Sequence, residues 1–110
     1  MREQKSIGLE QLVEALRGAG ETTRLRLLAL LQSGDLTVKD LTQILGQSQP
    51  RVSRHLKLLV EAALIERFPE GSWVYYRPSK SPVGLTAQAL LNTLNPSDSI
   101  LQRDQERLAD

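Results

Sequence analysis

The sequence predicts a small α+β domain that is mainly helical, with about five helices and a two-stranded β-hairpin. Two observations support this fold class. Apolar residues recur at intervals of three and four before residue 63 and again after residue 82, as amphipathic helices require. Between these segments, residues 64–77 form two runs rich in β-branched and aromatic residues around a Pro-Glu-Gly-Ser turn, which is typical of a hairpin. At 110 residues the chain has the length of one domain.

The first two helices are expected at residues 8–18 and from Glu21 to the Ser-Gly pair at residues 33–34. The first has one apolar stripe, which needs a partner, and ends at two nearby glycines, Gly18 and Gly20. The second has leucines on too many sides for a surface helix. We therefore expect the second helix at the centre of the core.

The third and fourth helices are expected to follow each other across a very short turn. Thr37 and Asp40 have the spacing of a capping box at the start of the third helix, and Gly46 ends it. Ser48 is a good N-cap for a fourth helix over residues 48–62, and Pro50 fits its first turn. Most sides of this fourth helix are polar and basic. Its single apolar stripe consists of Val52, Leu56, Leu59 and Val60.

After the hairpin, the sequence predicts a fifth helix that ends before Asn95-Pro96. Residues 99–109 have the composition of a further short helix. Most of the aromatic residues lie in the second arm of the hairpin, so we expect them to pack the sheet against the helices rather than to stack on bases. These residues are Trp73, Tyr75 and Tyr76.

Composition excludes several classes of function. The chain has no cysteine, which rules out disulfides, thiolate nucleophiles and cysteine-ligated metal centres. Its longest apolar run, residues 27–31, is far shorter than the roughly 20 residues of a membrane span, and residues 1–6 lack the pattern of an export signal. We therefore expect a cytoplasmic protein. With no glycine-rich phosphate loop and no paired acid and base, we expect no enzyme, metal or cofactor.

Positive charge is concentrated in the middle of the chain. The net charge is +1, with 14 Lys and Arg against 13 Asp and Glu, whereas residues 47–80 carry six basic and three acidic side chains. Such an excess is by itself weak evidence for a polyanionic partner. It gains weight from its position, because these residues lie on the fourth helix and the hairpin.

The order helix, turn, helix, hairpin predicts a winged helix-turn-helix. The helix-turn-helix is expected at residues 37–62 and the wing at residues 64–77. The major groove of B-DNA admits one helix, and an adjacent hairpin can reach the phosphate backbone beside it. We therefore expect a double-stranded DNA partner, with residues 48–57 in the major groove.

Three stretches resemble the ArsR/SmtB family of bacterial repressors: residues 21–28, 41–59 and 71–77. The most specific parts are the Ser-x-Pro-x-Val-Ser-x-His-Leu-x-x-Leu run that begins at Ser48 and the Gly-x-x-Val-x-Tyr run that begins at Gly71. The resemblance covers about residues 8–94. It implies a homodimer that binds a palindromic operator and releases it when an effector binds.

The same resemblance implies a dimer interface formed by the first and last helices, at residues 8–18 and 82–108. The family's sensing sites are missing, because Thr37-Val38-Lys39 stands where soft-metal sensors have Cys-x-Cys and residues 83–94 contain no His, Asp or Glu. Two possibilities are left open: the protein responds to an unidentified small-molecule effector, or it responds to no effector. The apolar residues expected in the interface are Leu9, Leu12, Val13, Leu16, Leu85, Leu90 and Leu94.

The polar face of the fourth helix supplies most of the candidate DNA-binding residues. Gln49 and Ser53 lie four residues apart near its N-terminal end, and a glutamine can bond N6 and N7 of adenine, so we expect them to read bases. Arg51 and Arg54 fit a guanine edge or, more often, a phosphate. The complete set is Gln47, Ser48, Gln49, Arg51, Ser53, Arg54, His55 and Lys57 of the helix-turn-helix and Arg67, Gly71 and Ser72 of the wing.

Several of these residues fit a second interpretation. Gln49, together with Ser48, fits a cap of the helix start, and Lys57 fits a solvated lysine. In the wing, Gly71 supplies the turn conformation and exposes backbone N–H groups to phosphate. Glu70 at the tip argues against deep insertion of the wing beside phosphates.

His55 and Arg24 are the most ambiguous residues. His55 fits a phosphate contact, packing against the wing or solvation, and the only carboxylate near it in sequence is Glu61, at an unsuitable spacing. Arg24 matches an arginine that is characteristic of the family. An ion pair of Arg24 with Glu21 or Asp40 fits equally well.

Two other functions remain open. The segment from Leu12 through the wing, with residues 95–108, is also similar to the N-terminal part of regulators in which this domain precedes an S-adenosylmethionine-dependent methyltransferase. The chain then fits the DNA-binding or regulatory portion of such a protein. Alternatively, the winged fold is a protein-interaction module whose first and last helices recruit another protein. The basic face of the fourth helix favours DNA over such a module.

Overall fold

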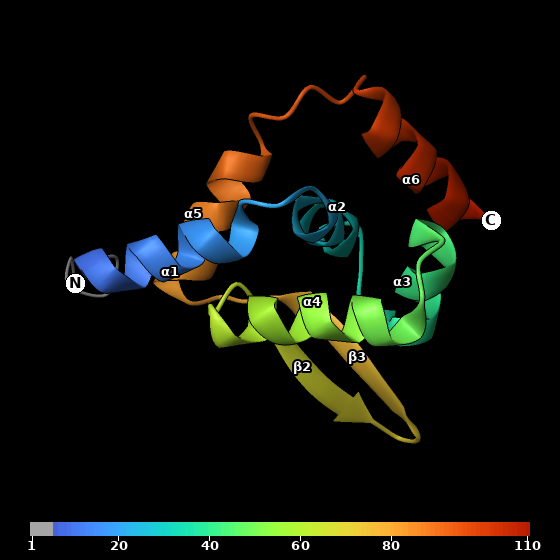
Figure 1. The fold of residues 1–110 in the computed structure, drawn as a ribbon, viewed down its shortest axis with the longest axis horizontal. Helices are drawn as coiled ribbons and strands as arrows, with labels where there is room; N and C mark the ends of the chain where they lie inside the picture. Colours follow the sequence, from blue (N-terminus) through green and yellow to red (C-terminus); the bar gives the residue numbers. More distant parts are fainter. Residues whose placement is uncertain (1–5) are drawn as a thin grey trace.

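The computed structural model describes residues 6–110. Residues 1–5, which belong to the segment predicted to lack an export signal, lie outside the described part. The chain forms six helices and a small sheet within residues 6–110 (Figure 1). In chain order the elements are α1 (Leu9–Ala19), α2 (Thr22–Leu31), β1 (Leu36–Thr37), α3 (Val38–Leu45), α4 (Gln49–Glu61), β2 (Ile65–Glu70), β3 (Trp73–Pro78), α5 (Pro82–Leu91) and α6 (Ser99–Ala109). This order confirms the predicted winged helix-turn-helix.

The central position predicted for the second helix is confirmed. Figure 1 shows α2 end-on in the middle of the molecule, with α1 and α5 to one side and α3 and α6 to the other. Four leucines of α2 are buried, and the apolar stripe of α4 packs against them at full burial except for the half-buried Val60. The buried apolar residues of these two helices are Leu27, Leu28, Leu30, Leu31, Val52, Leu56 and Leu59.

Local hydrogen bonds fix the helix-turn-helix as its sequence predicts. The hydroxyl of Thr37 accepts a hydrogen bond from the Asp40 amide at 3.1 Å, and the Asp40 carboxylate accepts one from the Thr37 amide at 3.0 Å. Gly46 ends α3 with a left-handed φ of 67°, which glycine adopts without strain. The hydroxyl of Ser48 then caps α4 by accepting from the Arg51 amide.

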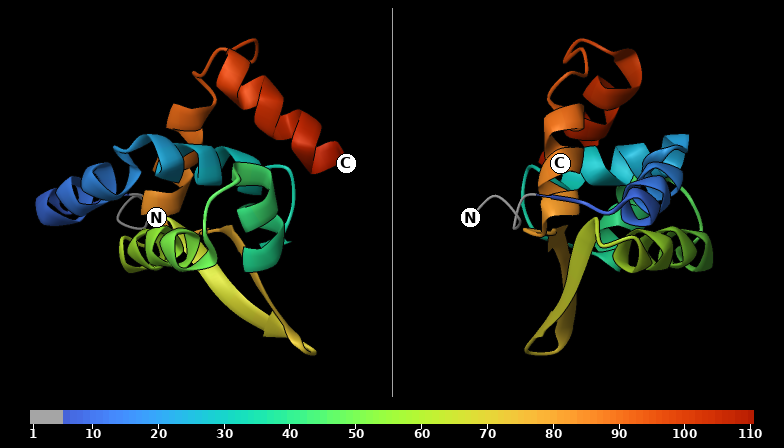
Figure 2. Two further views of the ribbon diagram at one scale, coloured as in Figure 1. Left: turned by 45° about the vertical axis from the view of Figure 1, so that its right-hand side comes forward. Right: turned by 90° about the vertical axis from the view of Figure 1, so that its left-hand side faces the viewer.

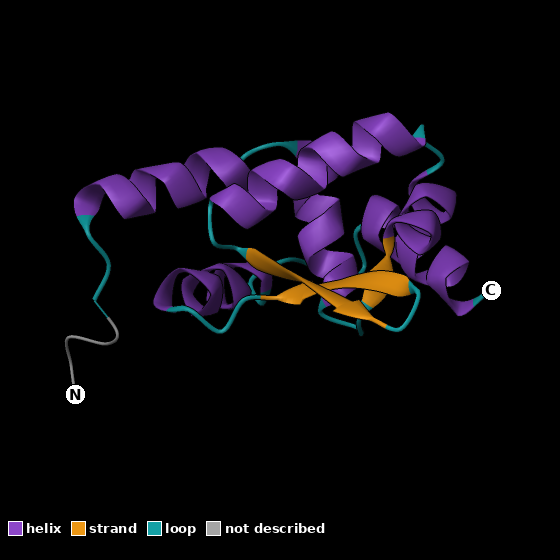
Figure 3. Ribbon diagram, turned by 90° about the horizontal axis from the view of Figure 1, so that it is seen from below, coloured by secondary structure: helices purple, strands orange, loops and turns teal. Residues whose placement is uncertain are grey.

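The sheet has one strand more than predicted. Its order is β1-β3-β2, and both pairs are antiparallel. The added strand β1 has only two residues, Leu36 and Thr37, which pair with Tyr76 and Tyr75 of β3. A two-residue strand is too short to show an alternating pattern, so the sequence does not predict it. It forms only because the distant β3 lies beside it. Seen from the side of the wing, the strands lie nearest the viewer and the helices behind them (Figure 3).

The C-terminal part differs from the prediction in its helix boundary and its packing. Helix α5 ends at Leu91 rather than just before Asn95, and the Asn95 side chain accepts a hydrogen bond from the Ser97 amide, which favours a turn. Helix α5 packs on α1, whereas α6 packs on α2 and α3 of its own chain (Figure 2). The segment 82–108 therefore contains two helices with different surroundings. Within residues 6–110, no helix is long and apolar enough to span a bilayer.

Candidate nucleic-acid interface

One side of α4 presents polar side chains that no other part of the described chain covers. Gln49, Arg51, Arg54 and Lys57 are exposed, and Ser53 is half-buried beside them. The Gln49 amide donates a hydrogen bond of 3.4 Å to the Ser53 hydroxyl, one helical turn away. No side-chain hydrogen bond or ion pair holds either arginine within residues 6–110. These cations are therefore free to meet an external anion.

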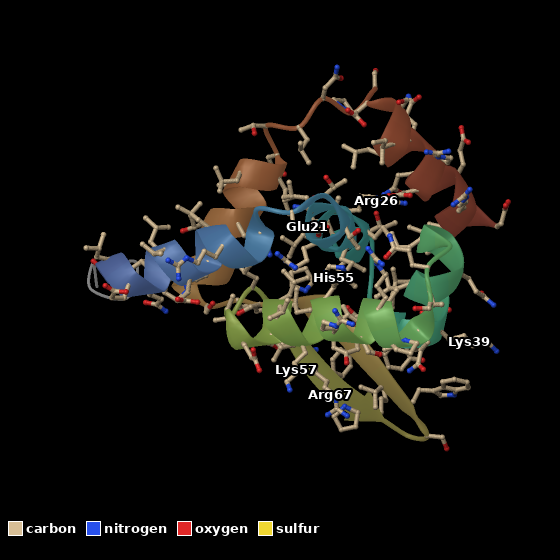
Figure 4. All side chains as sticks on the ribbon, viewed as in Figure 1. Glu21, Arg26, Lys39, His55, Lys57 and Arg67 are labelled. Atoms are coloured by element: carbon tan, nitrogen blue, oxygen red, sulfur yellow. The ribbon has the colours of Figure 1, made fainter. Side chains whose placement is uncertain are left out.

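The exposed side of α4 continues into the wing. Figure 4 shows Lys57 and Arg67 on the side of α4 that faces the wing, away from α2. Arg67 lies in β2 and is exposed. The chain reverses at Gly71 and Ser72, which are both exposed, and Gly71 has a φ of 63°. The arrangement brings the basic residues predicted on the fourth helix and those predicted on the wing to one side of the molecule.

Aromatic side chains stiffen the outer face of the wing. The rings of Phe68 and Tyr75 stack with centroids 5.7 Å apart, and the guanidinium of Arg77 lies 4.2 Å from the Phe68 centroid. Arg77 also forms an ion pair of 3.2 Å with Glu66 across the two strands. Cross-strand pairs of these kinds hold the hairpin in one shape.

Of the three aromatic residues expected to pack the sheet against the helices, only Tyr76 joins the core within residues 6–110, since Tyr75 is half-buried and stacks on Phe68. Tyr76 is buried in the core, but Trp73 is 53% exposed. Its position explains the difference, because Trp73 is the first residue after the Gly71-Ser72 turn and pairs with the exposed Glu70. The hairpin extends past the helices at this point (Figure 1). The expectation was therefore wrong for Trp73 and Tyr75 and right for Tyr76.

His55 lies between α4 and α2 rather than on the exposed side of α4. Its side chain is 14% exposed, and its Nδ1 atom lies 3.1 Å from Nη1 of Arg24. A guanidinium can only donate, so Nδ1 is the acceptor and the neutral ring carries its proton on Nε2. Figure 4 shows His55 pointing toward α2, below Glu21.

Burial and nearby charges set the protonation of His55. Burial lowers the pKa of His55 below its usual value, and the positive charges of Arg24, Arg51 and Arg54 lower this pKa further. The carboxylate of Glu21, 3.9 Å from Nδ1, acts in the opposite direction. The net effect favours the neutral ring, which keeps the acceptor that Arg24 needs.

Arg24 has different partners from the two that its sequence suggested. Its Nε donates to the carbonyl of Gly18 at 2.6 Å, and its Nη1 donates to His55. Glu21 caps α2 by accepting a hydrogen bond from the backbone amide of Arg24 at 2.9 Å. Sequence reasoning missed Glu21 as a neighbour of His55, and no local signal marks it, because the two residues are brought together only by the packing of α2 on α4.

Gln47, predicted as a DNA-binding residue, also faces inward. Its side-chain amide donates to the hydroxyl of the buried Thr23 at 3.2 Å, and its Oε1 is buried without a hydrogen-bond partner. Gln47 thus ties the turn between α3 and α4 to the start of α2. The predicted set accordingly divides into outward residues on α4 and the wing and two inward residues, Gln47 and His55.

A second surface is apolar. Helices α1 and α5 pack on each other and expose five leucines, and Leu94, predicted within the fifth helix, is exposed in the turn after α5. The exposed fractions of these six side chains lie between 36% and 77%. Val13, also predicted for the interface, is half-buried. Leu12, Leu16 and Leu90 line one hollow between α1 and α5, and exposed apolar side chains gathered in this way mark an interaction surface. The six residues are Leu9, Leu12, Leu16, Leu85, Leu90 and Leu94.

No group of three or more His, Asp or Glu side chains in the described part of the chain is placed to hold a metal ion.

Comparison with known proteins points to regulators of transcription. The family model described as "Bacterial regulatory protein, arsR family" matches residues 21–67, which run from the start of α2 through α4 into β2. The matched region contains the helix-turn-helix and the inward contacts of Gln47 and His55.

Two curated relatives are repressors. The chain is 43% identical over 68 residues to the arsenical resistance operon repressor of Escherichia coli (strain K12), a match that covers 61% of this chain and 58% of that protein. The chain thus spans little more than half the length of that relative. It is 35% identical over 92 residues to the arsenical resistance operon repressor of Bacillus subtilis (strain 168), covering 82% of this chain and 88% of the relative.

A solved structure has the same fold. It is the homodimeric winged helix-turn-helix DNA-binding domain of a possible ArsR-family transcriptional regulator from Mycobacterium bovis. The TM-score is 0.69 at 26% identity, and the match covers 74% of this chain and 76% of that one. None of these three proteins is described as a methyltransferase, so the second resemblance finds no support in them.

Proposed function

The chain belongs to the arsR family of bacterial regulatory proteins, and from this premise we propose that it is a transcriptional repressor that binds a DNA operator as a homodimer. One observation carries the proposal. Arg51 and Arg54 lie exposed on one side of α4, next to exposed Gln49, and their side chains have no ion-pair or hydrogen-bond partner in the part of the chain that the structure describes. Exposed cations without protein partners suit phosphate, which supplies much of the affinity of proteins for DNA.

The outward residues divide into base contacts and backbone contacts. The N-terminal half of α4 enters the major groove, where Gln49 and Ser53 meet base edges. Arg51 and Arg54 bind phosphates or a guanine edge beside them. The DNA backbone is contacted by Ser48 at the N-cap of α4 and by Lys57 further along α4. The wing residues Arg67, Gly71 and Ser72 contact the DNA backbone beside them. Gln47 and His55 support this surface from behind through Thr23 and Arg24.

The homodimer rests on the apolar surface of α1 and α5. Burying the six exposed leucines against a second copy removes apolar area from water, which stabilises association. The relative from Mycobacterium bovis is homodimeric, and this supports the same assembly here. A two-fold dimer presents two α4 helices to half-sites about one helical turn apart, so the operator is a palindrome.

A charge placed on that surface tests the dimer. Leu90→Glu introduces a carboxylate at an exposed position of α5, where it is harmless to a monomer but unfavourable in an apolar interface. We expect monomers by sedimentation and weakened operator binding. The control is Gln102→Glu, which adds the same carboxylate at an exposed position of α6, away from α1 and α5. A Leu90→Glu variant that stays dimeric would contradict the proposed interface.

The proposal names no effector. The chain has no cysteine, so thiolate ligation of a soft metal is not part of it. Repression that responds to a small organic molecule, or to none, fits the residues equally.

Selection from a pool of random duplexes tests the DNA-binding function and identifies the operator sequence in the same experiment. Purified protein should enrich a palindromic sequence and bind it with two protomers per duplex, in the presence of excess unrelated DNA. Binding should weaken steeply with salt, by about 0.9 log units per log unit of salt for each phosphate contacted. Failure to enrich any sequence would contradict sequence-specific repression and leave the protein-interaction module as the function.

A further inference from the structure

Helix α6 is fixed to the core by a buried ion pair. Asp104 is 1% exposed, although it carries a charge. Its two carboxylate oxygens accept hydrogen bonds from Nε and Nη2 of Arg26, both at 2.9 Å. This geometry is the strong two-bond form of the arginine–carboxylate pair. The hydrogen bonds to Asp104 raise the pKa of Arg26 against the opposing effect of burial. Helix α6 therefore docks on α2 in a defined register.

One turn further along, α6 reaches the end of α3. Nη1 of Arg107 donates a hydrogen bond of 3.0 Å to the backbone carbonyl of Ile44, in the last turn of α3. The last carbonyls of a helix lack partners within the helix, and a cation near them is favourable. Arg107 also lies close to Gly46, since a Cβ atom at that glycine would be 3.9 Å from Nη1.

The turn between α3 and α4 is thus held from two sides. On one side the Gln47 amide donates to Thr23 of α2, and on the other side Arg107 of α6 holds the Ile44 carbonyl. Only Gly46, Gln47 and the capping Ser48 connect the two helices. A change in the position of this short turn changes the angle at which α4 leaves α3.

We propose that α6 braces the helix-turn-helix, with Arg107 as a residue that positions the turn and the Arg26–Asp104 pair as its anchor. The proposal rests on the proposed DNA-binding function and assigns α6 to the DNA-reading part of its own chain. The measured affinity for DNA scales with the fraction of molecules whose α4 has the binding orientation. Arg107 raises that fraction without touching DNA.

Arg107→Ala tests the brace in the whole chain. Arg107 is exposed apart from its contact with α3, so its removal leaves no buried charge and the fold should persist. The control is Arg103→Ala, which removes the same charge from an exposed position one turn earlier on α6, where the side chain forms no hydrogen bond or ion pair within residues 6–110. Arg107→Lys keeps a charged donor and is the rescue variant. Asp104→Asn is less suitable, because it leaves the charge of the half-buried Arg26 without its counterion.

Two measurements are needed, on the free protein and on its complex. In the free protein, the amide of Gly46, which donates to the Thr42 carbonyl, should exchange with solvent faster in Arg107→Ala than in Arg103→Ala. In the complex with the selected duplex, Arg107→Ala should bind about five- to tenfold more weakly than Arg103→Ala, as loss of one partly exposed hydrogen bond implies. Arg107→Lys should recover part of both effects.

Three outcomes would overturn the brace. Equal exchange and equal affinity in the two alanine variants would show that Arg107 positions nothing. Weaker binding without faster exchange would make Arg107 a DNA contact instead. Faster exchange of the Gly46 amide with unchanged affinity for the duplex would show that the contact of Arg107 with α3 stabilises the fold but does not affect DNA binding. If the wild-type protein binds no duplex at all, the proposed function fails, and the exchange comparison by itself still tests whether α6 holds the turn.

Discussion

The outward and inward polar residues of the helix-turn-helix look alike in sequence and differ in their surroundings. The outward row consists of Gln49, Arg51, Arg54 and Lys57, which are exposed. The inward pair consists of Gln47 and His55, which bond to Thr23 and Arg24 of α2. Helical spacing separates polar from apolar sides, but it does not show which polar side a neighbouring helix covers. A polar residue that the neighbouring helix covers stabilises the fold, whereas one that stays exposed is available to bind DNA.

The two groups should therefore respond oppositely to substitution. An exposed cation without a partner contributes little to stability, so its loss should weaken DNA binding and leave the fold intact. A half-buried side chain that completes a hydrogen bond should lower stability when it is removed, because its partner is left unsatisfied. The contrast gives four predictions, from the largest effect to the smallest.

The largest effect is expected from removing both arginines of the outward row. Arg51→Ala with Arg54→Ala should weaken binding to the selected duplex by more than about tenfold and reduce the salt slope by about 1.8, or about 0.9 for each phosphate that is no longer neutralised. Thermal stability should stay near that of the wild type. Fluorescence anisotropy over a range of salt concentrations measures both the affinity and the salt slope.

Arg103→Ala controls for the loss of one positive charge, half of that removed by the double variant, because Arg103 lies on α6, away from α4. If the double variant kept the wild-type salt slope, the outward row would not be the phosphate-binding surface.

Gln49→Ala should change sequence preference more than overall affinity. A glutamine bonded to one adenine distinguishes that base pair by about 1–3 kcal/mol. Repeating the selection with the variant should relax the preference at one position of each half-site. Lys57→Ala, further along the same row, should weaken binding to all sequences evenly. If Gln49→Ala instead lowered the affinity for all DNA sequences evenly, Gln49 would contact the DNA backbone rather than a base.

His55→Ala should affect the fold more than the binding of DNA. It leaves Nη1 of Arg24 without its acceptor, so we expect the free energy of unfolding to fall by about 1 kcal/mol. Affinity for the selected duplex should change by no more than about twofold. Urea unfolding gives the first quantity and anisotropy the second. His55→Gln, which keeps an acceptor, should lower the free energy of unfolding less than His55→Ala does. If His55→Ala instead lost much of its affinity for DNA at unchanged stability, His55 would belong to the outward row.

The smallest effect is a pH dependence of stability that comes from His55. Its pKa is lowered in the folded protein, mainly by burial, so the unfolded chain binds the proton more readily between the two pKa values. Stability should be complete above the ordinary histidine pKa of about 6.5 and should fall as the pH drops through the lowered pKa. Urea unfolding at pH 7.5 and pH 5.5 should show a smaller difference in His55→Gln. Equal differences in both proteins would refute this origin.

Local patterns were sufficient to predict most elements and much of the outward row. The capping pair Thr37 and Asp40, and Ser48 at the start of α4, act over three residues, so the sequence marks them directly. The features that sequence reasoning missed depend on distant segments. Strand β1 exists because it pairs with β3, and Arg107 meets Ile44 across 63 positions of the chain.

The inward pair shows the same limit within the site itself. Arg24 and His55 are 31 residues apart, and each alone is compatible with a phosphate contact. Their meeting depends on the way in which α2 packs against α4, which no local pattern encodes. The exposure of Trp73 is likewise a consequence of how far the hairpin extends beyond the helices.

The most direct test of the contrast is an NMR titration of the protein with its selected duplex, followed through side-chain N–H signals. The signals of Gln49, Arg51 and Arg54 should shift on binding, because these side chains meet the DNA. The signals of Gln47 and Arg24 should stay, because they are bound to Thr23 and Gly18 in the free protein. Shifts of Gln47 and Arg24 with unmoved Gln49, Arg51 and Arg54 would contradict the account.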